Sequence, residues 1–351
     1  MAGPAHSNES PSRRTLRLTF GVTLTFVITQ LIAWPLAFVA PVFTVALLQE
    51  AAPLSVRQGL STLGSAFGSI LSGFLIGLFL MPYPAVLLLF VFVLLFRFYL
   101  YAMMSGANLL ALIGMLLGIV VIPVVVQLLP ELAFIAGFGF LVDFVVAILV
   151  AWVAFVLIPA PAAPAAHHHG EISYSGAAST AMDLSIVVAP LMAGFLIYGW
   201  TNILVLVYGV LFATAMSSSE SAKMGWKSLV ANLVYGGVGM LIAYEMLVMV
   251  PSLVFMVVLM FFAVMIYANR IFSSSPNASL WASGSFGFLL LLGPALTADE
   301  VDAGAKIIGR VFQLGLATVY VMFAFRLVDL VKSLFAGRRG RQPAQETASA
   351  D

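Results

Sequence analysis

The segment Arg57–Gly77, which reads RQGLSTLGSAFGSILSGFLIG, combines a long apolar run with glycines at helical spacing. Gly64 with Gly68 and Gly73 with Gly77 form GxxxG pairs, which let helix backbones approach closely in lipid. A helix needs about 20 apolar residues to cross a hydrocarbon core of about 30 Å. The segment therefore predicts a membrane-spanning helix that packs tightly against a neighbour.

The composition extends this prediction to the whole chain of 351 residues, of which 62% are hydrophobic and 8% are charged, with a mean hydropathy of +1.12. A soluble domain of this size would lack the charge to cover its surface. The apolar runs are too continuous for the alternating pattern of a membrane β-barrel. The net charge of +1 indicates no nucleic-acid partner. The absence of cysteine excludes disulfides and thiolate metal sites.

The apolar runs fall into two groups of six around a linker rich in Pro, Ala and His. The first run is too long for a signal-peptide core, so we expect an uncleaved first span. The predicted segments are 15–33, 35–50, 57–81, 83–103, 105–129 and 132–158, then 182–199, 201–217, 225–249, 251–270, 277–297 and 304–334. The predicted divisions are a disordered N-terminus (1–14), a first transmembrane repeat (15–158), the linker (159–180), a second transmembrane repeat (181–335) and a disordered basic and polar tail (336–351).

Charge placement favours an all-α polytopic membrane protein of about twelve transmembrane helices. With the amino terminus inside, almost all Lys and Arg residues fall on the cytoplasmic side, as the positive-inside rule requires. Merging the first two segments of each half into one bent element would place Arg57 outside. With six spans in each half, both termini are cytoplasmic and the halves are parallel repeats.

A shift of 166 residues supports the duplication, because distinctive residues of the first half then fall on matching ones in the second. The pairs are Trp34 with Trp200, Arg57 with Lys223, Gly59 with Gly225, Gly73 with Gly239 and Tyr101 with Tyr267. The second segment of each half is short, and the first copy contains Pro35 and Pro41. Such interrupted segments at matching places are typical of a transporter binding site. A tilted packing helix is the alternative, and whether segments 35–50 and 201–217 fully span stays open.

Two carboxylates inside predicted spans are candidates for proton coupling. Asp143 lies in the middle of the apolar run Ile135–Val150, and a lone carboxylate there suits a proton carrier. A buried ion pair or a packing hydrogen bond is the alternative for this residue. Glu245 lies about 9 Å from the outer end of its segment at 1.5 Å per residue, where snorkelling to the interface is the alternative role.

Three polar residues on one face of the last segment are candidates for binding a substrate anion: Lys306, Arg310 and Gln313. A guanidinium can hold a carboxylate through two hydrogen bonds. Pairing with the acidic residues at 299–302 is the alternative. Further side chains are candidates for lining a pathway: Asn232, Tyr235, Tyr244, Phe138 and Phe140.

No motif indicates an enzyme, a cofactor or a metal site. The chain contains no HExxH, P-loop or nucleophile-elbow pattern. The run His167–His169 has no Cys or carboxylate cluster around it, and a solvated linker is the expected role.

The order of these pieces resembles the fusaric acid resistance/aromatic acid exporter superfamily, in its small membrane-only branch of the DUF2955 type. The similar stretches are Arg17 through Pro41 and Arg57–Gly59 with the glycine helix that follows. In the second half they are Trp200 through Gly225 and the run Gly236–Gly239. The resemblance implies a bacterial inner-membrane exporter of aromatic carboxylic acids that works with a periplasmic adaptor and an outer-membrane channel.

The leading hypothesis is therefore a proton-coupled efflux transporter whose pathway lies between the two halves. The alternative is a scaffold that transports nothing, such as a secretion-complex subunit. The substrate, the coupling ion and homo-oligomerisation stay open at this point.

Overall fold

The computed structural model describes residues 9–32, 34, 36, 38–105, 109–161, 173–200, 203–215, 227, 230–296 and 303–339. Within these residues the regular secondary structure is helical throughout. The first half contains α1 (Pro11–Ile32), α2 (Val39–Gln49), α3 (Val56–Leu80), α4 (Pro84–Ser105), α5 (Leu109–Leu116), the π-helix η1 (Leu117–Val121), α6 (Ile122–Leu128) and α7 (Pro130–Leu157). The second half contains α8 (Tyr174–Tyr198), α9 (Ile203–Ala215), the π-helix η2 (Asn232–Gly237), α11 (Val238–Met249), α12 (Leu253–Ile271), α13 (Ala278–Leu296) and α14 (Ala303–Arg339).

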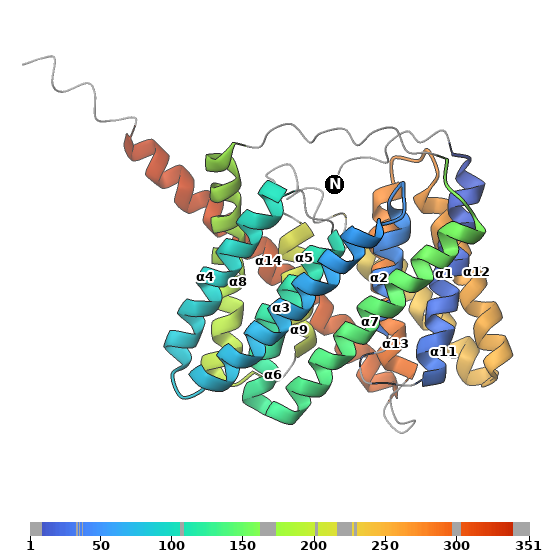
Figure 1. The fold of residues 1–351 in the computed structure, drawn as a ribbon, viewed down its shortest axis with the longest axis horizontal. Coiled ribbons are helices and arrows are strands. Elements are labelled where there is room, and N and C mark those ends of the chain that lie inside the picture. Colours follow the sequence, from blue (N-terminus) through green and yellow to red (C-terminus); the bar gives the residue numbers. More distant parts are fainter. Residues whose placement is uncertain are drawn as a thin grey trace, which may run out of the picture.

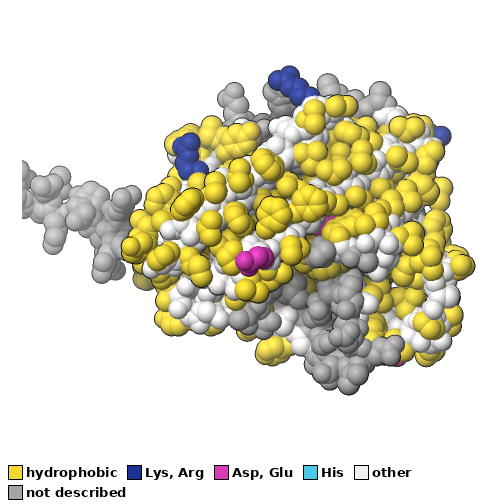
Figure 2. Space-filling model, turned by 60° about the horizontal axis from the view of Figure 1, so that its bottom comes forward, with side chains coloured by type: hydrophobic (Ala, Val, Ile, Leu, Met, Phe, Trp, Pro, Cys, Tyr) yellow, Lys and Arg dark blue, Asp and Glu magenta, His cyan; other side chains and the backbone are white. Residues whose placement is uncertain are grey.

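The protein is a multi-pass helical membrane protein. Among the described residues, 8 helical stretches are long and apolar enough to cross a membrane. Apolar side chains cover most of the described surface in Figure 2, with few charged groups between them. A surface of this kind suits lipid, because lipid tails need no polar partner.

The helices form two flanks around a packed centre (Figure 1). On one flank α4 packs along α8, and on the other α1 packs along α12. The continuous stretch α5–η1–α6 contains the most enclosed candidate span, with 89% of its residues buried. It contacts α3, α7 and α9, so it lies at the centre of the packed helices.

Glycines set the closest contacts between helix backbones. A Cβ atom on Gly73 of α3 would overlap the carbonyl oxygen of Gly118 in η1, and one on Gly118 would lie 2.5 Å from the backbone nitrogen of Ile70. The predicted tight packing of the glycine helix is therefore confirmed at Gly73. At Gly64 and Gly68, no atom lies within 4 Å of the Cβ position. The prediction that this GxxxG pair packs against a neighbouring helix is therefore wrong for the described residues.

Three helices extend beyond the boundaries that hydropathy predicts. Helix α1 begins at Pro11 rather than at residue 15, and α14 continues to Arg339 rather than ending at 335. Helix α8 begins at Tyr174, inside the stretch predicted as linker, because the hydroxyl of Ser173 accepts a hydrogen bond from the backbone N–H of Gly176. Hydropathy locates only the apolar part of a helix, whereas caps and polar contacts determine where it ends.

A substitution at Gly73 tests the contact between α3 and η1. Gly73→Ala should lower the free energy of unfolding by about 1–3 kcal/mol, because the new methyl group meets backbone that cannot rotate away. Thermal unfolding of the protein in detergent measures the effect.

Gly64→Ala is the matched control, because no atom lies within 4 Å of its Cβ position. This variant should leave stability unchanged or raise it slightly, since Ala favours a helix over Gly by about 1 kcal/mol. Equal melting temperatures for the two variants would contradict the described contact.

Candidate functional site

The site is built around a break between α1 and α2. Helix α1 ends at Ile32 and α2 begins at Val39, and the backbone at Leu36 between them has a φ of 67°, in the left-handed region that non-glycine residues rarely adopt. Helix α2 returns antiparallel to α1, since Thr25 near the end of α1 meets Thr44 at 2.9 Å and Arg14 near its start meets Gln49 at the end of α2.

Helix α2 is too short to cross a membrane. Its 11 residues span about 16 Å, roughly half of the hydrocarbon thickness. Its carboxyl end lies at the level of the start of α1, because Arg14 donates a hydrogen bond to the carbonyl oxygen of Gln49. The amino end of α2 therefore lies about 16 Å along the bundle from the end where α1 begins, next to the irregular stretch. Non-helical backbone at this depth requires burial in protein or a lining role in a cavity.

Asp143 lies beside this break, about halfway along α7. Its side chain is fully buried, and its Oδ1 accepts a hydrogen bond of 2.9 Å from the indole Nε1 of Trp34 in the irregular stretch. Its Oδ2 has no hydrogen-bond partner among the described residues. The next residue, Phe144, stacks on Phe43 of α2 with ring centroids 4.3 Å apart, which holds α7 against the start of the half-helix.

Among the described residues, the hydrogen-bonding capacity of this carboxyl group is only partly used. An ionised carboxylate accepts up to about four hydrogen bonds, and one indole donor supplies a quarter of them. A charged side chain inside a membrane is costly and marks an ion pathway, a proton relay or a ligand site in most cases. The chemistry open to Asp143 is thus the binding of a proton or of a cationic group at Oδ2.

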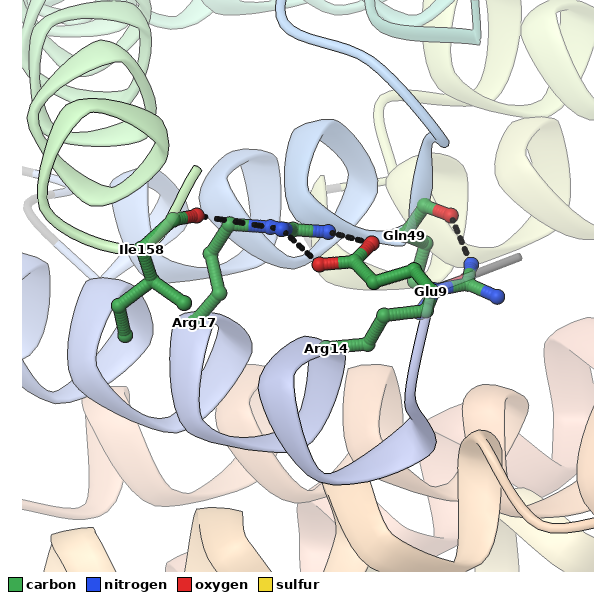
Figure 3. A network of polar contacts seen from close by, with 5 residues as sticks. All are labelled: Glu9, Arg14, Arg17, Gln49 and Ile158. Atoms are coloured by element: carbon green, nitrogen blue, oxygen red, sulfur yellow. Dashed lines mark hydrogen bonds and ion pairs between the residues drawn. The ribbon is translucent and has the colours of Figure 1, made fainter. Parts of the chain in front are cut away.

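A second polar cluster closes the end of the bundle where α1 begins (Figure 3). The guanidinium of Arg17 is fully buried, and its Nη1 and Nη2 donate to the two carboxylate oxygens of Glu9 at 2.6 and 3.0 Å. Its Nη1 also donates to the carbonyl oxygen of Ile158 at 3.3 Å, just after α7 ends. We call Glu9, Arg14, Arg17, Gln49 and Ile158 the terminal clamp, because these residues join the N-terminal segment to α1, α2 and α7.

Aromatic rings complete the clamp. The guanidinium carbon of Arg17 lies 4.3 Å from the centroid of Phe155, and that of Arg14 lies 4.3 Å from the centroid of Phe272 after α12. A buried charge pair of this kind needs such additional contacts to offset the loss of hydration. With this end closed and Asp143 fully buried, the described conformation is closed around the carboxylate.

The other predicted carboxylate lies elsewhere. Glu245 is exposed on α11, which packs against η2, α12 and α13, whereas α7 packs against α1, α2, α3 and α6. The structure does not bring Glu245 and Asp143 together, and a proton-coupling role for Glu245 stays a prediction. Its surface position fits the snorkelling alternative.

The predicted pathway residues divide into enclosed and exposed ones. Phe140 is buried and Tyr244 is half-buried, whereas Phe138 is 63% exposed. The exposed ring of Phe138 lines no internal path in this conformation, because alternate faces of α7 point to the core and to the surface. Asn232 and Tyr235 lie together on η2, where Asn232 is buried and Tyr235 is half-buried.

The predicted anion site is described only at Gln313, a half-buried residue of α14. The side chains of Lys306 and Arg310 lie outside the described part of the structure, so their role stays a prediction. The run His167–His169 lies outside it as well. Among the described residues, no group of three or more His, Cys, Asp or Glu side chains could hold a metal ion.

Two side-chain contacts of the site could not be predicted from the sequence. Trp34 stood out as a repeat landmark, but its hydrogen bond joins residues 109 positions apart, and no local pattern shows it. Glu9 and Arg17 are 8 positions apart, and their pairing depends on how the segment before α1 folds back. The only local signal was a Glu ahead of a cluster of arginines.

The comparisons with known proteins give one result. A family model described as "Protein of unknown function (DUF2955)" matches residues 14–154, which include the broken hairpin, Trp34 and Asp143. No curated protein matches the chain. No solved structure matches it either.

A double-mutant cycle tests the bond between Trp34 and Asp143. Trp34→Phe keeps an aromatic ring but removes the N–H donor, and Asp143→Leu removes the acceptor. We expect a coupling of about 1.5–3 kcal/mol between the two changes in unfolding free energy, the range for a hydrogen bond to a charged group. Unfolding in detergent measures all four proteins, and strictly additive effects would contradict the bond.

The terminal clamp predicts a strong effect at Glu9. Glu9→Gln should lower the unfolding free energy by about 3–5 kcal/mol, because it leaves the buried guanidinium of Arg17 without its counter-charge. The control is Asp183→Asn, which breaks the partly exposed pair with Lys332. An exposed pair contributes at most about 1 kcal/mol. Thermal unfolding of both variants should therefore differ clearly, and a milder effect at Glu9 than at Asp183 would refute the clamp.

Proposed function

We propose that the protein is a proton-coupled exporter of the bacterial inner membrane, which moves aromatic carboxylic acids or similar small compounds outward. The observation that carries this proposal is the buried carboxyl group of Asp143 beside the break between α1 and α2, with no hydrogen-bond partner for Oδ2 among the described residues. Discontinuous helices whose half-helix ends meet near the midplane are the recurrent substrate and ion sites of secondary transporters. The resemblance to aromatic acid exporters supports the substrate class.

In this mechanism Asp143 carries the coupling proton. The carboxyl group takes up a proton when the outer side is open and releases it when the inner side is open, while substrate moves the opposite way. Trp34 holds one carboxylate oxygen and leaves Oδ2 for the proton. The closed terminal clamp corresponds to a state in which the end near the start of α1 is shut.

The proposal includes two parallel six-helix repeats with about twelve membrane segments. One pair of helix ends supports it: moving Ile32, the last residue of α1, by 166 positions gives Tyr198, the last residue of α8.

Contacts between elements support the same layout. Helix α1 of the first half contacts α12 of the second, and α4 of the first half contacts α8 of the second. At a shift of 166 residues α1 corresponds to α8 and α4 to α12, so each contact is the counterpart of the other. The crossing of the third and fifth segments repeats as well: Gly118 approaches Ser69 and Ile70, and its counterpart Gly284 approaches Tyr235 and Gly236.

Each half also ties its first helix to its last near the same end. In the first half Arg17 reaches the carbonyl oxygen of Ile158 after α7. At the position 166 residues later, Asp183 of α8 pairs with Lys332 of α14. Arg17 and Asp183 have opposite charges, but each links the first helix of its half to the last. Such links within each half suit two halves that move as separate bodies.

An even number of segments and the excess of Lys and Arg at one end support cytoplasmic termini. A periplasmic adaptor and an outer-membrane channel would complete an export route, as the resemblance implies. A scaffold role is the second candidate, and the full burial of Asp143 favours it, since a packing carboxylate needs no access to water.

Asp143→Asn tests the transport proposal and separates the two candidates. The amide keeps the shape and accepts the Trp34 bond, but it cannot carry a proton. We expect proton-driven uptake of aromatic acids into inverted vesicles, which corresponds to export from the cell, to fall to background while expression and melting temperature stay near those of the wild type.

Asp183→Asn is the matched control, because it removes a carboxylate outside the site and should leave efflux intact. Wild-type efflux in Asp143→Asn would overturn the proton-carrier role. No uptake into inverted wild-type vesicles over a panel of aromatic acids would favour the scaffold.

A further inference from the structure

A cluster of aromatic side chains with one guanidinium lies at the end of the second half where α12 ends and α13 begins. The rings of Tyr235 and Trp281 stack with centroids 4.3 Å apart and planes 10° apart. Tyr267 meets Trp281 edge to face at 5.9 Å, and its hydroxyl donates to the carbonyl oxygen of Tyr235. Arg270 places its guanidinium carbon 5.6 Å from the centroid of Trp281.

The cluster is accessible and incompletely paired. Tyr235 and Trp281 are half-buried and Arg270 is exposed, so a ligand can reach the rings and the cation from outside. Arg270 has no ion-pair partner among the described residues. At the start of η2, the buried Oδ1 of Asn232 has no hydrogen-bond partner among these residues.

The backbone brings these groups together through a local irregularity. Asn232 and Tyr235 lie on η2, a π-helix, and the extra residue in such a turn often marks a functional site. Gly284 allows the close approach of α13, since a Cβ atom there would lie 2.8 Å from the Cβ of Tyr235. The aromatic rings thus stack across the crossing of η2 and α13.

The first half shows that the fold does not require this cluster. The positions 166 residues earlier make the same crossing with small or aliphatic side chains: Ser69 for Tyr235, Met115 for Trp281, Met104 for Arg270 and Ala66 for Asn232. Only the tyrosine at Tyr101 and Tyr267 is common to both. The small and aliphatic side chains of the first half are sufficient for packing at this crossing. The aromatic rings and the guanidinium of the second half therefore need another explanation.

We propose that Tyr235, Trp281 and Arg270 form a docking site for a planar aromatic anion, at the end of the protein that also holds the terminal clamp. The accessible parts of the stacked rings contact the aromatic ring of the ligand, and the guanidinium binds its carboxylate through a charge-assisted hydrogen bond. This inference rests on the proposed export function, for which the cluster would select substrate on the cytoplasmic side before the clamp opens. Asp143 has no part in this binding step.

Equilibrium binding to the purified full-length protein in detergent tests the site, with benzoate as the probe. Cyclohexanecarboxylate keeps the charge without a π face, and benzamide keeps the ring without the charge. Benzoate should bind at least about tenfold more tightly than either compound, because only benzoate uses both the rings and the cation. Inorganic phosphate serves as the fourth ligand, and competition by phosphate at equal strength would assign the cation to a phosphate or lipid headgroup and overturn the proposal.

Variants that install the first half's residues locate the binding. Trp281→Met and Arg270→Met should each weaken benzoate binding at least about tenfold with little change in melting temperature, since the first half folds with methionine at both places. Trp281→Phe keeps a ring and should restore most of the affinity. Met104→Ala is the control on the other half, and it should bind benzoate as the wild type does. Wild-type affinity in Trp281→Met or Arg270→Met would overturn the site.

The binding assay separates this inference from the proposed function. Asp143→Asn should bind benzoate normally while it fails to transport, because the two sites are distinct. Aromatic-selective binding at the cluster without any efflux by the wild type would retain the site and reject the exporter. Efflux of aromatic acids that is unchanged in Trp281→Met and Arg270→Met would retain the exporter and reject the site.

Discussion

Backbone polar groups in hydrocarbon need partners inside the protein, and the break between α1 and α2 depends on this constraint. The stretch after Ile32 leaves the helical conformation, and Leu36 adopts a positive φ. Enclosure by α7 and α13, which both pack against α2, makes this irregular backbone tolerable. The same enclosure buries Asp143 and sets Trp34 beside it, so the polar site exists because the helix is broken there.

The glycine crossings make that enclosure possible. Gly118 and Gly284 remove the side chains that would separate the third and fifth segments of each half. A glycine crossing occurs in both halves, but the side chains around it differ. The first half holds the buried carboxylate, and the residue 166 positions after Asp143 is Gly309. The second half holds the aromatic cluster with Arg270, where the first half has Ser69 and methionines.

Much of the fold was predictable because membrane insertion reads average hydrophobicity over about 20 residues, which is a local property. Each predicted apolar segment of the described chain contains a helix. Boundaries were less predictable, since α1 and α8 begin at caps and polar contacts that hydropathy does not register. The depth of α2 could not be predicted, because a run of this length can span, tilt or stop halfway.

The site shows the same division between local and long-range information. Asp143 was identifiable, because one carboxylate in the middle of an apolar run is costly wherever the run packs. Its partner Trp34 was not, since the bond depends on how two distant helices meet. Phe138 and Phe140 are two positions apart on one helix, and only packing decides that the first is exposed and the second buried.

The sequence by itself determined that this is a multi-pass helical membrane protein with a lone carboxylate in the middle of one apolar segment, because hydrophobicity and charge act through local composition. The tertiary structure alone decided that α2 is limited to 11 residues, that Trp34 reaches Asp143, and that Glu9 folds back onto Arg17. It also decided that Tyr235, Trp281 and Arg270 gather at one crossing. These are contacts between residues far apart in the chain, and their geometry depends on the packing of every helix between them.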